Sequence, residues 1–330
     1  MITFEERLKE DRPILYDGGF GSQLFARGIQ LTNSTLANES DPDAVADIHK
    51  AYIEAGSEVV GTNTFVASAL HLEMAGKEGE DADEIARLAV RNAKRVVRES
   101  GRDVYIAGSI GPSPGAIEAD AGDTTFGIAD EKVRDAHRRL SSVLAEEGVD
   151  FLLIETQFSA NEAAIAVDEA RKHGLPILVS MTYKFTKDRK SGEIVYKTDW
   201  GHSPGFLLDA LASGTHSGGD DLIPFVHGMG LNCGAETSQP NHTGMPYAVE
   251  GTNQLSRGLK DRGVNGKCLV AYPNAGMPLL DKKMETVYSQ SSDDMSAHLP
   301  EVLGSGIRFI GGCCGTGPEH ISAFRAALDS

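Results

Sequence analysis

The sequence predicts a single (β/α)8 barrel of the α/β class, and two features of its pattern lead to that prediction. Eight short apolar runs rich in Val and Ile recur along the 330 residues, and segments with the apolar spacing of amphipathic helices separate them. Continuous apolar runs are typical of strands buried on both faces, as in a parallel sheet. Eight parallel strands with helical crossovers can close into a barrel. We therefore expect one barrel domain over residues 1–330, with its active site at the carboxyl ends of the strands.

The predicted strands and helices alternate along the whole chain. We expect the strands at residues 14–16, 58–60, 104–107, 151–154, 177–179, 230–232, 268–271 and 307–310. Between and after them, eight helices are predicted by apolar stripes at Val45, Ile48 and Tyr52; Ile85, Leu88, Ala89 and Val96; Val133, Ala136, Leu140 and Leu144; Ala160, Ala163, Ala164 and Val167; Leu207, Leu208 and Leu211; Leu255 and Leu259; Met295, Leu299 and Val302; and Ile321, Phe324 and Leu328. An open doubly wound sheet is the main alternative, but no change of composition and no linker marks a second domain.

The composition narrows the class of partner. The chain carries 31 Lys and Arg against 48 Asp and Glu, a formal net charge of −17. Such a chain repels phosphate backbones and anionic lipids, so we expect small molecules or proteins as partners, and neither nucleic acid nor membrane. The N-terminus is charged where a signal peptide would be apolar, and no run reaches the ~20 apolar residues of a membrane span. We expect a cytoplasmic protein whose four cysteines do not form a disulfide framework.

Small and polar residues follow each predicted strand. Asp17 and two glycines follow the first strand, Glu155 follows the fourth, Asn232 ends the sixth with Cys233 directly after it, and a glycine-rich turn over residues 311–317 follows the eighth. In a barrel these strand ends meet at one face, which builds the active site. We expect Asp17 and Glu155 to belong to the site, and the alternative for each is an exposed acid that caps a helix or turn.

The cysteines form the main candidate site. Cys313 and Cys314 are adjacent in the glycine-rich turn, and Cys233 lies at the corresponding end of the sixth strand. Neighbouring side chains of a strand point to opposite faces, so both thiols can face one centre only if the glycines of residues 311–317 let the chain leave extended geometry. Three convergent thiolates with one open position would form a catalytic zinc site. The alternative is that they are reduced core cysteines, as we expect for Cys268.

Four further segments can be interpreted. Residues 183–200 combine Tyr183, Phe185, Tyr196 and Trp200 with several Lys and Arg residues, which favours either aromatic packing of a long loop or a cage for a cationic ligand. The glycines of residues 311–317 also suit a phosphate-binding turn. Residues 213–221 and 234–243 look like loop insertions without an assigned role.

The order of these motifs is similar to that of a known family. With Asp17-Gly18-Gly19 first, Gly-Leu-Asn-Cys233 in the middle and Gly-Gly-Cys313-Cys314-Gly-Thr last, nearly the whole chain resembles the homocysteine S-methyltransferase family. The resemblance implies a barrel in which Cys233, Cys313 and Cys314 bind Zn2+ and the sulfur of homocysteine becomes the fourth ligand. It also implies that a methyl group is transferred to that sulfur to give methionine.

The resemblance implies roles for the other strand-end residues. Asp17 and Glu155 match acids that hold the amino group of homocysteine, and the backbone amides of Gly18 and Gly19 can take its carboxylate. Asn232 precedes a ligand cysteine and is expected to orient it.

The methyl donor has three candidate classes. Residues 44–64 and 271–278 are similar to the homocysteine-binding module of cobalamin-dependent methionine synthase, which favours a methyl group carried by a separate corrinoid protein. S-methylmethionine or a betaine are the small-molecule candidates. We expect no folate or cobalamin module within the 330 residues. Two other functions stay open, a non-catalytic regulatory barrel that binds zinc and homocysteine, and a phosphate-binding barrel lyase.

Overall fold

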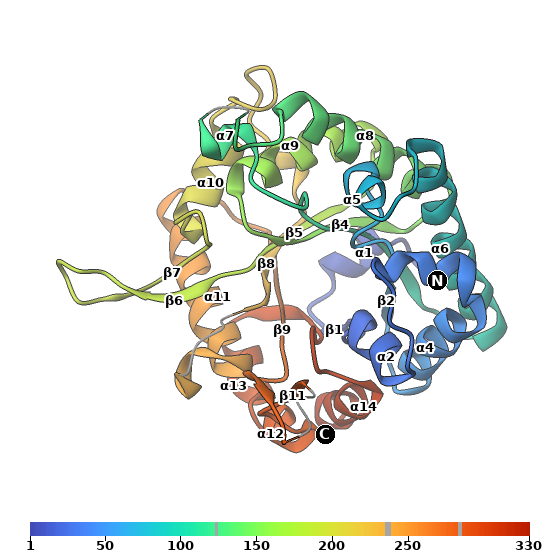
Figure 1. Ribbon diagram of the computed structural model, residues 1–330. Helices are drawn as coiled ribbons and strands as arrows, with labels where there is room; N and C mark the ends of the chain where they lie inside the picture. Colours follow the sequence, from blue (N-terminus) through green and yellow to red (C-terminus); the bar gives the residue numbers. More distant parts are fainter. Residues whose placement is uncertain (123–124, 235–238, 283–285) are drawn as a thin grey trace.

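Eight parallel strands form a nearly closed barrel surrounded by helices (Figure 1). The computed structural model describes residues 1–122, 125–234, 239–282 and 286–330. Around the barrel the strands follow the order β1 (Ile14–Leu15), β12 (Ile307–Ile310), β9 (Cys268–Pro273), β8 (Gly228–Cys233), β5 (Ile177–Met181), β4 (Phe151–Gln157), β3 (Tyr105–Ile110) and β2 (Val59–Gly61). At the seam between β1 and β2, the Glu58 amide donates to the Leu15 carbonyl at 2.8 Å. The predicted barrel is therefore confirmed, and the open doubly wound sheet is not found.

Each predicted helix is present outside the barrel, but the single helix predicted from Met295, Leu299 and Val302 is divided into two short helices. The helices are α4 (Pro42–Glu54), α6 (Gly79–Ser100), α8 (Asp130–Glu146), α9 (Ala160–Ala170), α10 (Pro204–Ala212), α11 (Gly244–Asp261), the pair α12 (Ser292–Ala297) and α13 (Leu299–Gly304), and α14 (Pro318–Leu328). Short helices that the apolar spacing did not predict lie in the connections, namely α1 (Phe4–Lys9), α2 (Phe20–Ala26), α3 (Ala37–Ser40), α5 (Ala69–Met74) and α7 (Glu118–Ala121). None of the helices in the described part of the chain is long and apolar enough to cross a membrane.

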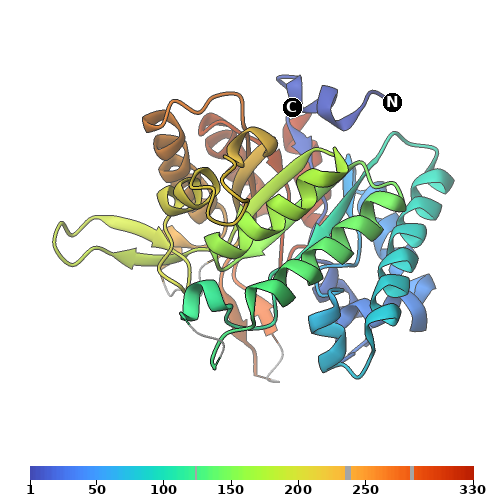
Figure 2. The ribbon, with the colours of Figure 1, turned by 90° about the horizontal axis from the view of Figure 1, so that it is seen from above.

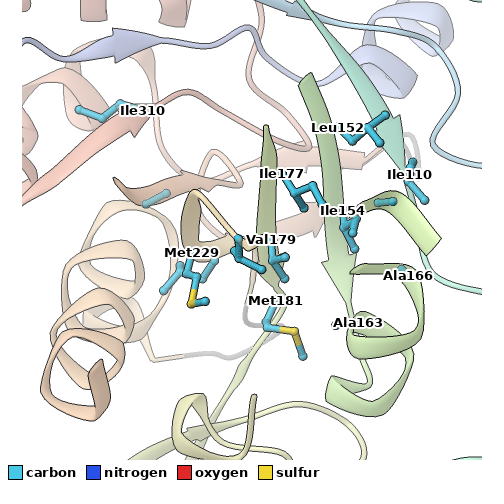
Figure 3. Packing of buried hydrophobic residues seen from close by; sticks show 14 of the residues in the cluster. Ile110, Leu152, Ile154, Ala163, Ala166, Ile177, Val179, Met181, Met229 and Ile310 are labelled. Carbon is cyan, nitrogen blue, oxygen red and sulfur yellow. The ribbon is translucent and has the colours of Figure 1, made fainter. Parts of the chain in front are cut away.

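The two faces of the strands pack into different cores. On β4, Phe151 and Leu153 face the barrel interior, whereas Leu152 and Ile154 belong to the layer between the sheet and the helices. This alternation follows from the two-residue period of a strand. Figure 3 shows Ile154 near Ala163 and Ala166, whose small side chains let α9 approach the sheet closely. By the same alternation, the side chain of Glu155 falls on the interior face.

Helix α1 covers the amino end of the barrel. Its Phe4 ring stacks on Phe151 with the centroids 3.8 Å apart and contacts the edge of Tyr105. Both chain ends lie at this end of the molecule (Figure 2). Because the amino end is filled by aromatic side chains, the opening available for ligands lies at the carboxyl ends of the strands.

Two antiparallel hairpins extend the loops and were not predicted. Strands β6 (Lys184–Lys187) and β7 (Ile194–Lys197) form a ribbon that projects from the barrel (Figure 1), and β10 (Pro278–Leu280) pairs with β11 (Thr286–Tyr288). Residues 183–200 are thus partly a hairpin rather than a plain loop, and their tyrosines Tyr183 and Tyr196 are fully buried at its base. This burial supports the packing interpretation of those aromatic residues.

Of the two segments interpreted as loop insertions, residues 213–221 are described in full and residues 234–243 in part. Residues 213–221 lie against the outer helices, where Asp220 pairs with Arg171 at 2.8 Å and the His216 carbonyl accepts from Arg134. Of residues 234–243, positions 235–238 lie outside the described residues. His242 in the same segment packs against Phe185, with ring centroids 4.5 Å apart.

Candidate active site

A cavity of about 470 Å³ opens at the carboxyl ends of the barrel strands. Seven of the eight predicted site residues line it, namely Asp17, Gly18, Gly19, Glu155, Cys233, Cys313 and Cys314. The eighth, Asn232, lies fully buried beside them. A groove of about 530 Å³ between α4 and α6 contains none of these residues and is lined mainly by surface charges. We place the candidate site in the strand-end cavity because the thiols and the buried acids meet there.

The three predicted cysteines converge. The sulfur atoms of Cys233, Cys313 and Cys314 all lie within 4.8 Å of one another, and no other group of three such ligands occurs among the described residues. A tetrahedral zinc ion with Zn–S distances near 2.3 Å requires sulfur atoms about 3.8 Å apart. The donor set and its spacing therefore fit a zinc ion. Cys268 is buried in the barrel core and takes no part, as predicted.

Cys233 reaches this cluster because its backbone leaves strand geometry. On β8, Met229 and Leu231 face the helices, so regular alternation would turn Asn232 inward and Cys233 outward. Cys233 instead has φ of +54°, a left-handed conformation that is rare for residues other than glycine. The turn that this conformation makes carries its thiol toward Cys313 and Cys314.

The turn that carries Cys313 and Cys314 is held by backbone contacts from neighbouring strand ends. The Cys313 amide donates to the Pro273 carbonyl at 2.9 Å, and the Cys314 amide donates to Asn274 Oδ1 at 3.1 Å. Of the four glycines there, only Gly315 has a positive φ, at +80°. Gly311 serves close packing instead, because a β-carbon on it would stand 2.8 Å from the Asp17 carbonyl oxygen. Glycine is therefore needed at Gly315 for its backbone conformation and at Gly311 for close packing.

The three thiols shift one another's pKa values strongly. Hydrogen bonds from the Cys233 and Cys313 thiols hold the pKa of Cys314 well below its ordinary value, and Tyr288 also hydrogen-bonds this sulfur. The hydrogen bond with Cys233, the neighbouring Cys314 and burial raise the pKa of Cys313 well above its ordinary value. One thiolate is thus readily formed, whereas three buried thiolates repel one another unless a cation lies between them. The cluster therefore has the chemistry of a cation site.

Glu155 is a buried acid with two hydrogen-bond donors. Its side chain accepts from the Ser109 hydroxyl and from Tyr272. Burial raises the pKa of Glu155 to about 7, and the hydrogen bonds from Ser109 and Tyr272 oppose a further rise. A nearby cation would stabilise the ionised form of this buried carboxyl group, because it would offset the cost of burying the negative charge.

Asp17 faces the same cavity but also makes a structural hydrogen bond. Its Oδ2 accepts from the Gly61 amide at 2.8 Å, which ties the end of β1 to the end of β2 at the barrel seam. Burial raises the pKa of Asp17 well above its ordinary value, the Gly61 amide opposes this shift, and the charge of Glu155 adds to it. Asp17 therefore closes the barrel in addition to lining the cavity, a role that the sequence did not indicate.

The two glycine amides differ in availability. The Gly19 amide donates to the Thr316 carbonyl at 2.9 Å and to Thr316 Oγ1 at 3.1 Å. It is therefore occupied, and the expectation that both amides take a carboxylate needs correction. The Gly18 amide has no hydrogen-bond partner in the described part of the chain, so it is the one of the two that a ligand can use.

Several residues of the site were not singled out from the sequence. Ser109 and Tyr272 bond Glu155, Asn274 bonds the Cys314 backbone, and Thr316 bonds Gly19. Ser109 and Tyr272 are the second-last residues of their strands, and the other two lie in the segments that follow a strand. This position at the strand ends is the signal that could have found them. Trp200 does not line the main cavity. It lines a smaller adjacent pocket of about 310 Å³ with Phe158.

Comparison with known proteins gives consistent matches. The family model described as Homocysteine S-methyltransferase matches residues 14–328. Homocysteine S-methyltransferase 4 of Zea mays is 27% identical over 335 residues, covering 94% of this chain and 88% of the maize protein. Methionine synthase of Mycobacterium tuberculosis is 28% identical over 340 residues, covering 96% of this chain but only 25% of the synthase. The chain thus spans about a quarter of that relative.

A solved structure with the same fold is also known. The homocysteine methyltransferase MmuM from Escherichia coli, in its metallated form, matches with a TM-score of 0.70 and 21% sequence identity. The match covers 96% of each chain. It supports the barrel architecture described above.

Proposed function

This chain belongs to the homocysteine S-methyltransferase family and is thus of the methyltransferase class, and on that premise we propose that it methylates the thiol of homocysteine to give methionine with the aid of zinc. The observation that carries the proposal is the convergence of three cysteine sulfurs from two strand ends in the strand-end cavity. The relatives reported above are named as enzymes, and none of them supports a non-catalytic regulatory barrel.

Cys233, Cys313 and Cys314 would hold the zinc ion. Three protein ligands leave one coordination position for a substrate, which is the pattern of catalytic zinc sites. When bound, zinc would lower the pKa of the homocysteine thiol, so that its sulfur is a thiolate near neutral pH. The convergence of Cys233 with the turn cysteines also favours this use of the glycine-rich turn over phosphate binding.

The buried acids would hold the amino group of the substrate. Glu155 and Asp17 line the same cavity as the thiols, and each pays a desolvation cost that a bound ammonium group would offset. Both acids already accept hydrogen bonds within the protein, Glu155 from Ser109 and Tyr272 and Asp17 from Gly61, and each carboxylate keeps further acceptor positions for an ammonium group. The free amide of Gly18 would take the substrate carboxylate. These contacts would fix the thiol end of homocysteine toward the cysteines.

Methyl transfer then depends on the approach of a donor. The attacking sulfur and the methyl carbon must come within about 3 to 3.5 Å in line with the leaving group, and the protein contributes by orienting the sulfur and excluding competing water. The donor classes to be compared are a corrinoid-borne methyl group, S-methylmethionine and a betaine. The acceptor is homocysteine with each of these donors, and the assay below identifies the donor.

The test is methionine formation by the purified, zinc-loaded chain. Homocysteine is supplied with free methylcobalamin, S-methylmethionine, glycine betaine or dimethylsulfoniopropionate in parallel, and methionine is measured by mass spectrometry. The proposal expects turnover with at least one donor and its loss after chelation of the metal. Cys268→Ser provides the matched control, because this thiol lies in the core outside the site. Turnover that survives complete metal removal, or none with any donor, would contradict the proposal.

A further inference from the structure

Two residues of the cavity have strained backbones. Among the described residues other than glycine, only Thr156 and Cys233 have a positive φ, at +56° and +54°. Thr156 lies near the end of β4 and Cys233 ends β8, and strand β5 separates these two strands. A β-branched residue such as threonine is a clear outlier in this conformation. Such strain persists only where surrounding contacts hold it, and it concentrates at functional sites.

The contacts that hold Thr156 come from Asn232. The Thr156 amide donates to Asn232 Oδ1 at 2.9 Å, and Asn232 Nδ2 donates back to Thr156 Oγ1 at 2.7 Å. Ser180 of the intervening strand β5 donates to the same Oδ1 at 2.8 Å. Asn232 and Ser180 are fully buried, and Thr156 is 7% exposed. Two donors on one side and an acceptor on the other determine which way the Asn232 amide points.

The oriented Asn232 amide also contacts the thiol cluster. Asn232 Nδ2 lies 3.8 Å from the sulfur of Cys313, and Asn232 directly precedes Cys233. Thr156 in turn directly follows Glu155. The two hydrogen bonds between Thr156 and Asn232 therefore connect the Glu155 segment to the cysteines. Asn232 precedes Cys233 and contacts Cys313.

We propose that Thr156 is a positioning residue whose hydroxyl, by orienting the Asn232 amide, sets the spacing of the cysteine sulfurs and keeps the Glu155 carboxylate in register with them. The inference rests on the proposed function, because it assumes that the three sulfurs bind zinc. Thr156 makes no direct contact with the metal in this scheme. Its hydroxyl acts through Asn232, much as outer contacts tune the ligands of other metal sites.

The substitutions Thr156→Gly, Thr156→Val and Thr156→Ser separate this role from a purely structural one. Glycine adopts a positive φ without strain, which offsets part of the cost of leaving the buried Asn232 Nδ2 without this acceptor, so Thr156→Gly should melt no lower than Thr156→Val in the metal-free protein. It lacks the hydroxyl, however, and its zinc affinity should fall by about 10- to 100-fold, the usual effect of losing an outer contact to a metal ligand. Thr156→Val should lose zinc affinity similarly, whereas Thr156→Ser keeps the hydroxyl and should stay close to the wild-type affinity.

A matched control comes from the core. Thr252 is fully buried in α11 and its hydroxyl has no partner in the described part of the chain, so Thr252→Val removes a hydroxyl of the same kind away from the site. Its zinc affinity should equal that of the wild type. Zinc affinity is measured by competition with a chromogenic chelator, and homocysteine binding to the zinc-loaded proteins by calorimetry. Homocysteine binding should weaken in Thr156→Gly and Thr156→Val and recover in Thr156→Ser.

The outcomes are distinguishable. Wild-type zinc affinity in both Thr156→Gly and Thr156→Val would overturn the positioning role and leave the proposed function intact. An equal loss in Thr156→Ser and Thr156→Val would also overturn it, because the hydroxyl would then not be the determining group. A wild-type protein that binds no zinc would instead overturn the proposed function, and the positioning role would fall with it.

Discussion

Gly19 and Cys313, which are far apart in the sequence, are in contact where the first and last barrel strands end. A β-carbon on Gly19 would stand 2.5 Å from the carbonyl oxygen of Cys313, although Gly19 itself has an ordinary negative φ of −67°. The requirement for glycine at this position is therefore steric and comes from the turn that carries two of the three converging thiols.

Gly19→Ala should disturb both the fold and the thiol cluster. The added methyl group must push the turn away, which costs about 1 to 3 kcal/mol of unfolding free energy as in other overpacked sites. Zinc affinity should fall as well, because Cys313 moves. Gly304→Ala is the control, since a β-carbon at that position would have no atom within 4 Å. Urea unfolding and chelator competition measure the two effects, and equal behaviour of both variants would contradict the steric argument.

Replacement of the turn cysteines should remove the metal. Purified protein should contain about one zinc ion per chain, and Cys313→Ser or Cys314→Ser should lose it because a hydroxyl is a much poorer zinc ligand than a thiolate. Cys268→Ser should retain its zinc. Elemental analysis of the purified variants decides the question, and full retention by both turn variants would exclude these cysteines as ligands.

Loss of the Glu155 charge should weaken substrate binding. Glu155→Gln keeps the shape but removes the partner of an ammonium group, so homocysteine affinity should fall by about 1.5 to 3 kcal/mol, with zinc content unchanged. Because the pKa of Glu155 is about 7, wild-type binding should strengthen as the pH rises through 7 and the carboxyl group ionises. The variant should lack this contribution and keep only the pH dependence that comes from the homocysteine thiol, which would bind zinc as a thiolate. Calorimetric titrations at pH 6 and pH 8 test both points, and the same pH dependence in both proteins would place Glu155 outside the site.

The same substitution should affect stability in the opposite direction. The folded protein binds the Glu155 proton more tightly than the unfolded chain, since the pKa rises from 4.5 to about 7 on folding. Wild-type stability is therefore highest below pH 4.5 as far as this group is concerned and declines as the pH rises through 7. Relative to wild type, Glu155→Gln should gain on the order of 3 kcal/mol between pH 4.5 and pH 8. Urea unfolding without homocysteine measures it, and a pH-independent difference would refute the shifted pKa.

Removal of the Ser109 hydroxyl should move the titration of Glu155. Its hydrogen bond to Glu155 opposes the effect of burial, so Ser109→Ala should raise the pKa of Glu155 further. The pH above which homocysteine binds well should then shift upward. In the Glu155→Gln background the same substitution should cause no such shift, which separates this effect from a general loss of packing.

The barrel and the strand ends at which the site forms could be predicted from the amino-acid sequence alone. The period of the apolar residues is a local property, so the eight barrel strands and the helices between them could be predicted within a few residues. The residues that follow each strand could then be assigned to one face, because parallel strands bring their carboxyl ends together. All eight predicted site residues lie at or beside the cavity for this reason.

The hydrogen bonds that those residues make could not be predicted and became known from the folded barrel. Asp17 accepts from Gly61, the Gly19 amide is occupied by Thr316, and Asn232 reaches Thr156 and Cys313 as well as its neighbour Cys233. Apart from the link between Asn232 and its neighbour, each of these contacts joins residues at least 44 positions apart, as the pair Gly61 and Asp17 illustrates. Hydrogen-bond partners at such separations depend on closure of the barrel and on the left-handed turns at Thr156 and Cys233, and neither follows from a local pattern of side chains.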